Sequence, residues 1–338
     1  MKRPTENEFA GCLIGQCLGD ALGFPVEGES PEVCQSYVHD FVRTGRVVKQ
    51  CRGRYRFGQY SDDSQLAREL MQSFVACGGF DPRDYADRIA AIFVEERIVG
   101  QGFATQAAAF RLAAGLAWEE AGTPPPAAGN GAAMRAGPVG LLFSGDPERM
   151  VHVAHEQSRI THKDARCSAG AILIAGSVAL ILRHTPTKLP EFTDQLAGWV
   201  APFDPALASA LPRMEKWLQS EPEVAVREIS RIGLDPDHVD AWQHISPFVT
   251  TSVLWSLYSF LKHPDNYLEA IGTAIAAGGD VDTTAAMTGA ISGARVGLEE
   301  LPMDLVQLLN DNETWRYEEL VELSRKCHSM VMAARNPR

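Results

Sequence analysis

The sequence predicts an all-α fold, and three observations support that prediction. Apolar residues recur at helical spacing in segments that are spread along the 338 residues from one end to the other. No run combines two-residue alternation of apolar and polar residues with hairpin turns, so we expect no sheet. Apolar residues make up 45% of the chain and aromatic residues 8%, a composition rich in Ala and Gly that suits closely packed helices.

The first predicted helix covers residues 8–22 and carries one face of small residues. Glycine recurs there at every fourth position, as Gly11, Gly15, Gly19 and Gly23. Each glycine costs a helix roughly 1 kcal/mol relative to alanine, so four on one face indicate that another backbone packs very close. Dimerising membrane helices use the same spacing, but Asp20 and the short apolar run favour a buried helix of a soluble protein.

Helical spacing continues through the rest of the chain. In residues 61–76, Leu66, Leu70 and Phe74 form one apolar stripe. Further helices are predicted over residues 82–95, 105–119, 146–160, 164–182, 189–198, 205–219, 224–233, 248–261, 267–276, 282–296 and 315–332. No linker is long or biased enough to force a boundary, so one domain over residues 1–338 is predicted, with segment 185–244 as a possible insertion or cap.

Charge and cysteine usage argue against several classes of protein. The net charge of −12 argues against a protein that binds nucleic acid through its phosphates. The seven cysteines, without a Cys-x-x-Cys pair, indicate neither a disulfide framework nor a thiolate zinc site, and we expect a reducing, cytoplasmic location. The apolar stretch 9–26 contains Gln16 and Asp20 and follows acidic as well as basic residues, so neither a secretory signal nor a membrane span is predicted.

Two predicted helices begin with paired carboxylates. One opens with Ser61, Asp62, Asp63 and Ser64, and the other opens with Asp280, Asp282 and Thr283 after two glycines. Each cluster alone fits ordinary helix capping, in which side-chain oxygens accept hydrogen bonds from the first N–H groups. Four carboxylates that converged without a cation would repel one another, whereas a hard divalent metal would bind them.

The residue types in both clusters favour Mg²⁺ or Mn²⁺. Neither cluster contains His or Cys, which argues against zinc. Two ions roughly 3.5–4 Å apart would suit a shared set of carboxylates. The residues alone leave open whether the two clusters meet.

Five short motifs follow one another along the chain. They are Gly-Asp-Ala-Leu-Gly at 19–23, Tyr-Ser-Asp-Asp-Ser at 60–64, Gly-Asn-Gly-Ala-Ala-Met-Arg at 129–135, Thr-His at 161–162 and Gly-Gly-Asp-Val-Asp-Thr at 278–283. In this order they resemble the ADP-ribosylglycohydrolases, the enzymes that reverse ADP-ribosylation, including the type that activates dinitrogenase reductase. The resemblance runs from about residue 11 to residue 297 and implies a compact orthogonal multi-helix bundle with a binuclear metal cleft.

The resemblance also implies which residues hold two Mg²⁺ ions, or Mn²⁺ in their place. The implied ligands are Ser61, Asp62, Asp63, Asp280, Asp282 and Thr283. The family usually has threonine at the positions of Ser61 and Ser64, and serine lacks the methyl group that stiffens threonine. Glu27 is expected to act as general base, outer ligand or gate, with Asp62 or Asp63 as alternative groups for proton transfer. By local sequence alone, Glu27 is an exposed loop carboxylate.

By the same resemblance, the loop at residues 129–135 lines the ribose and diphosphate, since small residues let backbone N–H groups approach phosphate oxygens. The implied substrate-binding residues are Gly100, Gly102, Gly129, Asn130, Gly131, Met134, Arg135 and His162. Arg135 either contacts the phosphates or braces the metal loop, and His162 lies near the distal ribose. By local sequence alone, the loop is a helix-entry turn and His162 a surface cap.

The implied activity is hydrolysis of the N- or O-glycosidic bond between ADP-ribose and an acceptor, in an ADP-ribosylated protein or a small ADP-ribose derivative. Residues 60–74, with Gly100 and Gly102, resemble the serine-type branch and favour ADP-ribosyl-serine slightly over arginine. Ala127 and Ala128 stand where that branch has a hydroxyl and an aromatic residue, which argues against it. The alternatives are a non-catalytic, crystallin-like member of the same fold and a metal-dependent hydrolase of phosphate esters. The oligomeric state is not predicted.

Overall fold

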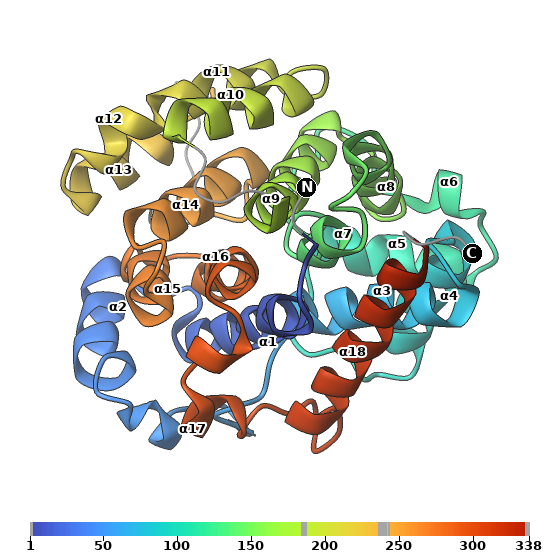
Figure 1. Ribbon diagram of the computed structural model, residues 1–338, viewed down its shortest axis with the longest axis horizontal. Coiled ribbons are helices and arrows are strands. Elements are labelled where there is room, and N and C mark those ends of the chain that lie inside the picture. Colours follow the sequence, from blue (N-terminus) through green and yellow to red (C-terminus); the bar gives the residue numbers. More distant parts are fainter. Residues whose placement is uncertain (1–2, 184–187, 236–241, 243, 335–338) are drawn as a thin grey trace.

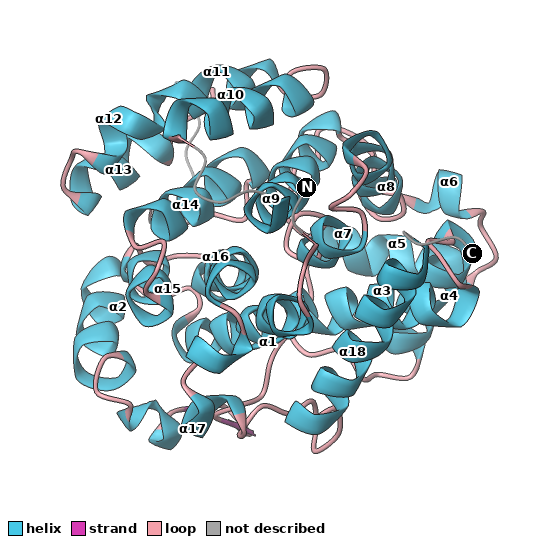
Figure 2. Cartoon of the chain, in the orientation of Figure 1, coloured by secondary structure: helices cyan, strands magenta, loops and turns pink. Residues whose placement is uncertain are grey.

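The computed structural model describes residues 3–183, 188–235, 242 and 244–334, and most of these residues are helical (Figures 1 and 2). The only strands among the described residues have two residues each and form one hairpin. In it, β1 (Cys51–Arg52) pairs antiparallel with β2 (Tyr55–Arg56). The prediction of an all-α fold is confirmed.

Two helices packed backbone to backbone form the centre of the fold, α1 (Glu6–Gly23) and α16 (Val281–Val296) (Figure 1). A Cβ atom on Gly11 would lie 2.3 Å from the carbonyl oxygen of Gly293, and one on Gly19 would lie 2.2 Å from that of Ala285. No side chain fits at such distances, so the glycine face exists because a second backbone occupies its space. The predicted close approach is confirmed.

These two helices run antiparallel, which brings the end of α1 next to the start of α16. Gly11 faces the C-terminal end of α16, whereas Gly23 faces Asp282 at its start. A short 3₁₀ helix, η1 (Phe24–Val26), then leads from α1 to Glu27 at the same end. The end of the first helix and the second acidic helix start are therefore neighbours.

The remaining helices surround this central pair. Helices α3 (Asp62–Cys77) and α18 (Tyr317–Ala334) pack against α1, while α9 (Ala165–Arg183), α14 (Val249–Lys262) and α15 (Tyr267–Ala276) pack against α16. The other elements are α2 (Pro31–Tyr37), η2 (Val38–Val42), η3 (Arg46–Lys49), α4 (Pro82–Val94), α5 (Phe103–Ala113), α6 (Trp118–Ala121), α7 (Gly137–Leu142), α8 (Pro147–Arg159), α10 (Leu189–Val200), α11 (Pro205–Ala210), η4 (Leu211–Arg213), α12 (Met214–Leu218), α13 (Pro222–Ile229), η5 (Leu298–Glu300) and α17 (Met303–Val306).

Two predicted helices are interrupted in the structure. The pattern over residues 105–119 divides into α5 and α6, with Gly115 between them at a φ of +90°, which a helix interior does not allow. The pattern over residues 205–219 divides at Pro212, which lies in η4 and lacks the N–H that a continuous helix needs. Helices α2 and α7 were not predicted, because seven and six residues are too few to show a periodicity.

Two of the described helical segments are long and apolar enough to span a membrane by length and composition, Glu6–Val26 and Ala165–Arg183. In the fold, 94% and 83% of their most apolar windows are buried. Burial in the protein core accounts for that composition.

Helices α10 to α13 form an outer layer that packs on α9 and α14 (top of Figure 1). They belong to segment 185–244, the possible insertion or cap. Trp242 of the same segment lines the cavity described below, while residues 185–187, 236–241 and 243 lie outside the described residues. The assignment of a single domain stays a prediction.

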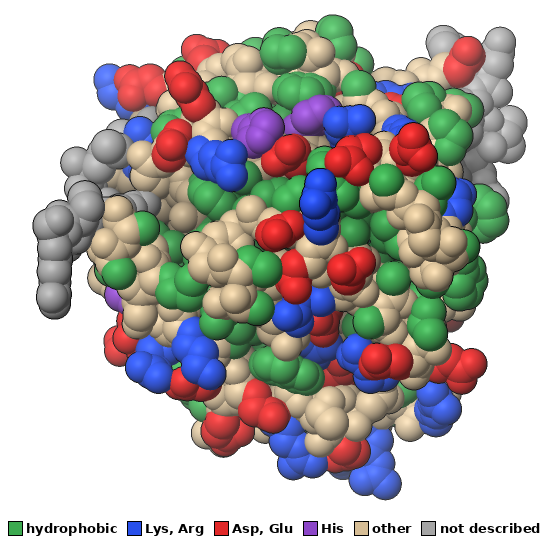
Figure 3. Space-filling model, turned by 90° about the vertical axis from the view of Figure 1, so that its right-hand side faces the viewer, with side chains coloured by type: hydrophobic (Ala, Val, Ile, Leu, Met, Phe, Trp, Pro, Cys, Tyr) green, Lys and Arg blue, Asp and Glu red, His purple; other side chains and the backbone are tan. Residues whose placement is uncertain are grey.

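The surface carries mixed charge. On the face shown in Figure 3, Lys and Arg side chains are interspersed with Asp and Glu side chains rather than gathered by sign. Such a mixture is typical of a solvated surface.

Candidate metal centre and ligand cavity

The two acidic helix starts meet in one cavity. Asp62 and Asp63 begin α3, Asp280 is the N-cap of α16, and Asp282 lies in the first turn of that helix. All four line a cavity of about 430 Å³, together with Thr283 and Glu27. Segments more than 200 residues apart thus supply one set of carboxylates.

The carboxylates in this cavity fit a divalent cation. Carboxylate oxygens of Glu27, Asp280 and Asp282 lie within 4.8 Å of one another. Oδ1 of Asp63 is buried and has no hydrogen-bond partner among the described residues. A buried carboxylate oxygen without a partner is costly, and a donor set made only of oxygen atoms suits Mg²⁺ or Mn²⁺.

Without a cation, these carboxyl groups resist ionisation. Burial raises the pKa of Asp280 to about 6. Burial also raises the pKa of Asp62, Asp63 and Asp282 well above their usual range, and the neighbouring carboxylates add to each rise. Like charges in a dry site disfavour the ionised form. A bound divalent cation would reverse this preference.

Two residues of α1 hold the first helix start in place, and their role was not predicted. The carboxylate of Asp20 accepts hydrogen bonds from the backbone N–H of Ser61 at 2.9 Å and of Ser64 at 3.1 Å. Nε2 of Gln16 donates to the backbone oxygens of Asp63 at 3.0 Å and Met134 at 2.9 Å. The signal was available, because a buried helix rarely carries two polar residues without partners for them.

Ser61 supports the carboxylate of Asp63 from behind and is not among the residues that line the cavity. Its side chain is fully buried, and its hydroxyl donates to Oδ2 of Asp63 at 2.9 Å. As the N-cap of α3 it also accepts from the N–H of Asp63. These two hydrogen bonds use the hydroxyl proton and one lone pair, so the ligand role of Ser61 stays a prediction.

The loop at residues 129–131 is tied to the second helix start. Nδ2 of Asn130 donates to Oδ2 of Asp280 at 2.5 Å and to Oγ of Ser252 at 3.3 Å. The backbone N–H of Asn130 donates to the Pro247 carbonyl at 2.9 Å. Gly129, Asn130, Gly131 and Met134 all line the cavity. The structure therefore places these four sequence-predicted residues beside the carboxylates.

His162 lines the cavity against the same loop. A Cβ atom on Gly131 would lie 2.9 Å from Cε1 of His162, so only glycine fits there beside the ring. Nδ1 of His162 lies 2.8 Å from the Thr161 hydroxyl, and that hydroxyl accepts a hydrogen bond from Arg135. Burial lowers the pKa of His162 to about 3, so the ring is neutral. With Nδ1 accepting from Thr161, we assign the ring proton to Nε2.

Arg135 does not reach the cavity. Its side chain is fully buried, with Nε donating to Oε1 of Gln157 at 2.8 Å and a terminal nitrogen donating to the Gln157 carbonyl at 2.8 Å. Its guanidinium also lies 5.6 Å from the centroid of the Tyr85 ring. Of the two roles considered, this geometry matches bracing, and it gives no contact with a ligand in the cavity.

Gly100, Gly102 and Phe103 form another wall of the cavity. Gly100 has a φ of +64°, and a Cβ atom there would lie 3.2 Å from Oδ1 of Asp62. Phe103 is 81% exposed although it lines the cavity. Sequence reasoning missed Phe103, because an aromatic residue at a helix start carries no signal of its own.

Glu27 is the only carboxylate among the described cavity residues that is not buried, with 25% of its side chain exposed. It is ion-paired with Arg52 of the β1–β2 hairpin. Its position at the edge of the cluster is compatible with each of the three predicted roles, base, outer ligand and gate.

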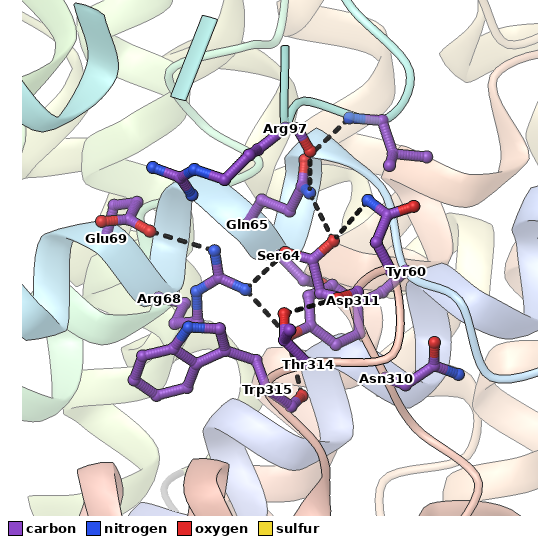
Figure 4. Close-up of polar contacts among 12 residues, drawn as sticks. Tyr60, Ser64, Gln65, Arg68, Glu69, Arg97, Asn310, Asp311, Thr314 and Trp315 are labelled. Atoms are coloured by element: carbon purple, nitrogen blue, oxygen red, sulfur yellow. Dashed lines mark hydrogen bonds and ion pairs between the residues drawn. The ribbon is translucent and has the colours of Figure 1, made fainter. Parts of the chain in front are cut away.

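A second buried charge cluster lies further along α3, and it contains its own cation (Figure 4). Arg68 is fully buried and donates to Asp311 at 2.7 Å and to Glu69 at 3.0 Å. Gln65 joins this cluster to the cavity wall, because it donates to Asp311 at 2.7 Å and accepts from the N–H of Val99 at 2.9 Å. The Val99 carbonyl in turn accepts from the N–H of Asp62 at 2.7 Å.

Comparisons with known proteins give one family. Residues 1–336 match the family model described as ADP-ribosylglycohydrolase. The chain is 28% identical to the ADP-ribosylhydrolase ARH3 of Bos taurus, over 95% of this chain and 92% of that protein. It is 24% identical to the ADP-ribosyl-(dinitrogen reductase) glycohydrolase of Rhodospirillum rubrum, over 89% and 90%. A solved structure described as an ADP-ribosylglycohydrolase-related protein complex aligns with a TM-score of 0.73 and 26% identity, covering 97% of this chain and 99% of that chain.

Proposed function

The chain belongs to the ADP-ribosylglycohydrolase family, and on that premise we propose that it hydrolyses the glycosidic bond between ADP-ribose and a modified acceptor, releasing ADP-ribose. The observation that carries the proposal is the convergence of both acidic helix starts and the 129–131 loop on one cavity. At about 430 Å³ the cavity lies within the range of small-molecule sites.

The cofactors that we infer are two Mg²⁺ ions, with Mn²⁺ as a substitute. The residues that would hold them are Asp62, Asp63, Asp280, Asp282 and Thr283, all of which line the cavity. Bound divalent ions would neutralise the carboxylates and polarise a sugar oxygen or a water molecule. Ser61 would keep Asp63 oriented through its hydrogen bond.

The reaction adds water across the bond between the anomeric carbon and the acceptor. A water oxygen bonds to that carbon, and the acceptor leaves with the bonding electrons and takes up a proton. Glu27 is suited to move a proton at this edge of the cavity, because its side chain is 25% exposed there and its ion pair with Arg52 holds the carboxylate in place. Neutral His162 would donate from Nε2 to a ribose hydroxyl.

Phe103 would provide the surface on which the adenine base stacks. Its ring is exposed at the cavity wall, and stacking of a base on an aromatic ring contributes roughly 1–3 kcal/mol. Phe103→Ala should weaken ADP-ribose binding about tenfold and leave ribose 5-phosphate binding unchanged, as measured by calorimetry. Phe110→Ala is the matched control, because Phe110 on the same helix is 53% exposed but does not line the cavity.

For the acceptor we infer a slight preference for serine over arginine, from the local resemblance at residues 60–74, Gly100 and Gly102. The described residues that line the cavity do not include Ala127 or Ala128. The acceptor would therefore be selected by groups elsewhere at the cavity mouth.

The test compares serine- and arginine-ADP-ribosylated peptides, each with Mg²⁺ and with EDTA. We expect ADP-ribose release that requires Mg²⁺ and is faster from serine. Faster arginine cleavage would contradict the preference alone, whereas release of inorganic phosphate or of no product would contradict the proposed function.

A further inference from the structure

Residues 43–56 form a basic segment in an acidic chain. Acidic residues outnumber Lys and Arg by 43 to 31 over the whole sequence, yet no Asp or Glu occurs from position 41 to position 60. This basic segment contains Arg43, Arg46, Lys49, Arg52, Arg54 and Arg56. Its charge differs from the mixed surface of Figure 3.

The basic segment ends at the rim of the cavity. Its β1–β2 hairpin packs against η1, directly before Glu27. Arg52 is ion-paired with Glu27, donates to the Phe24 carbonyl at 3.0 Å, and lies 4.7 Å from the centroid of the Phe24 ring. The hairpin is therefore fixed to the cavity carboxylate that reaches the surface.

Four of the six cations have no carboxylate partner among the described residues. Arg43 pairs with Glu269, and Arg52 pairs with Glu27. The exposed cations that form no ion pair with a described residue are Arg46, Lys49, Arg54 and Arg56. Uncompensated surface cations attract anions and steer their approach.

Arg54 and Arg56 face a hollow of about 290 Å³ beside the hairpin. Within the described part of the chain, Glu313 is the only carboxylate that lines this hollow, and it is ion-paired with Arg316 at 2.6 Å. Arg54 and Arg56 are two and four residues from Arg52, so their Cα atoms lie within about 14 Å of it. A chain leaving the cavity at Glu27 needs only a few residues to reach them.

We propose that this basic segment binds acidic residues that flank the ADP-ribosylated side chain of a polypeptide substrate. The inference rests on the proposed function and adds the kind of acceptor. The occupant is a polypeptide because the cavity would take the ADP-ribosyl group while the acceptor chain remains at its mouth, against the hairpin. Its charge is negative because guanidinium groups that have no carboxylate partner in the described chain can pair with carboxylates of the substrate; Arg54 donates only to the Tyr55 hydroxyl, at 2.9 Å.

A nucleic acid fits this surface less well. Long polyanions bind through many phosphates at once, whereas here the described residues offer four unpaired cations in a chain with a net charge of −12. A short run of Asp or Glu matches the size of the basic segment. Exposed ion pairs are individually weak, so two or three of them together should give roughly a three- to tenfold effect on kcat/KM.

The test uses three peptides that carry the same ADP-ribosylated residue and differ only in four flanking positions, filled by Glu, Gln or Lys. For the unmodified full chain we expect kcat/KM to fall in the order Glu, Gln, Lys. The advantage of Glu over Gln should be roughly three- to tenfold at 20 mM NaCl. It should shrink at 300 mM NaCl, because salt screens exposed charges.

The variant Arg54→Glu/Arg56→Glu should lose the preference for Glu and keep its rate on a free ADP-ribosylated amino acid. The matched control is Arg83→Glu/Arg149→Glu, which makes the same charge change at the exposed starts of α4 and α8. This control should keep the order of the three peptides.

The outcomes separate the two proposals. If the unmodified protein releases ADP-ribose from no substrate, the proposed function fails. If it acts equally on all three peptides, or the hairpin variant keeps the preference, the docking inference is overturned. A single-stranded oligonucleotide of equal charge that binds more tightly than the Glu peptide would also overturn it.

Discussion

Helix α3 carries two buried charge clusters, one made of carboxylates alone and one that also contains a cation. At its start, Asp62 and Asp63 face Asp280 and Asp282 with no positive side chain among the described residues that line the cavity. Further along, Arg68 is held by Asp311 and Glu69 (Figure 4). The first cluster has raised carboxyl pKa values and a buried oxygen without a partner among the described residues, whereas the second contains its own cation.

This difference distinguishes a cluster suited to bind a ligand, at the cavity, from a cluster suited to stabilise the fold, around Arg68. A buried charge cluster that compensates itself holds the chain in one conformation, and removing one partner leaves an uncompensated charge. A buried cluster of like charges without a counter-ion lowers the stability of the ligand-free protein. Such clusters are typical of functional sites. Substitutions in the two clusters should therefore act on different measurable quantities.

The largest effect is expected at the carboxylate cluster. Asp282→Asn should lower turnover of an ADP-ribosylated peptide by a factor of about 100 or more, because it removes an oxygen that we propose as a metal ligand. The metal-free variant should unfold at the same temperature as the metal-free parent or at a higher one, since a repulsion is removed. Asp304→Asn on the exposed surface of α17 is the control. A less stable Asp282→Asn protein with full turnover would invert the comparison.

A substitution in the cluster around Arg68 should change the stability of the folded protein. Arg68→Met should lower the free energy of unfolding by about 3–5 kcal/mol, because Asp311 and Glu69 lose their buried partner. Urea unfolding of the metal-free protein measures this loss. Arg68→Met/Asp311→Leu should recover part of it. A loss below about 1 kcal/mol would mean that the cluster contributes little.

The stability of the metal-free protein should depend on pH through the carboxyl groups with raised pKa values at and behind the cavity. Burial raises the pKa of Asp20 to about 7 and that of Asp280 to about 6. The folded protein therefore retains protons that the unfolded chain has released, and stability falls as pH rises from about 4 to about 7. His162 opposes this trend, because its pKa of about 3 makes folding less favourable below pH 6.5.

The five raised carboxyl groups outweigh His162 at mildly acidic pH. The metal-free protein should melt at least about 2 °C higher at pH 5.5 than at pH 7.5. Saturating Mg²⁺ should reverse the order by favouring the ionised carboxylates. A metal-free protein that is more stable at pH 7.5 would show that the carboxylates are compensated by other groups.

The smallest effect tests the link between the clusters. Gln65→Met removes the hydrogen bonds to Asp311 and Val99. We expect Mg²⁺ affinity to fall roughly threefold, because Asp62 is positioned through Val99, with a stability loss of about 1–3 kcal/mol for the groups left unpaired. Gln35→Met on the exposed side of α2 is the control. Unchanged Mg²⁺ affinity would show that the clusters are independent.

The predictable features were those encoded within a few residues. Paired carboxylates marked both helix starts, although only Ser61 makes a side-chain capping bond and Asp280 makes none. The glycine face of α1 indicated a close neighbour. The identity of that neighbour, α16, depends on packing between segments far apart in the chain. The need of Asp20 for a partner could be predicted from its place in a buried helix, but the partners themselves could not, because they are backbone N–H groups on another element.

Arg135 shows that a motif can also predict a contact with the ligand that the fold does not form. A motif places it beside the ligand loop, but its side chain turns into the core and bonds Gln157 and Thr161. Sequence proximity to a loop does not fix the direction of a side chain. Likewise, Gly115 and Pro212 end helices whose apolar spacing continues past them.

The most direct test of the central claim, that two distant helix starts build one metal site, is equilibrium binding of Mn²⁺ to the chelator-treated protein at pH 7.5. We predict that the unmodified protein binds two Mn²⁺ ions that Mg²⁺ displaces. Asp63→Asn and Asp282→Asn, one from each start, should each lose at least one ion or weaken both. Unchanged binding in either variant, or no binding by the unmodified protein, would contradict the account.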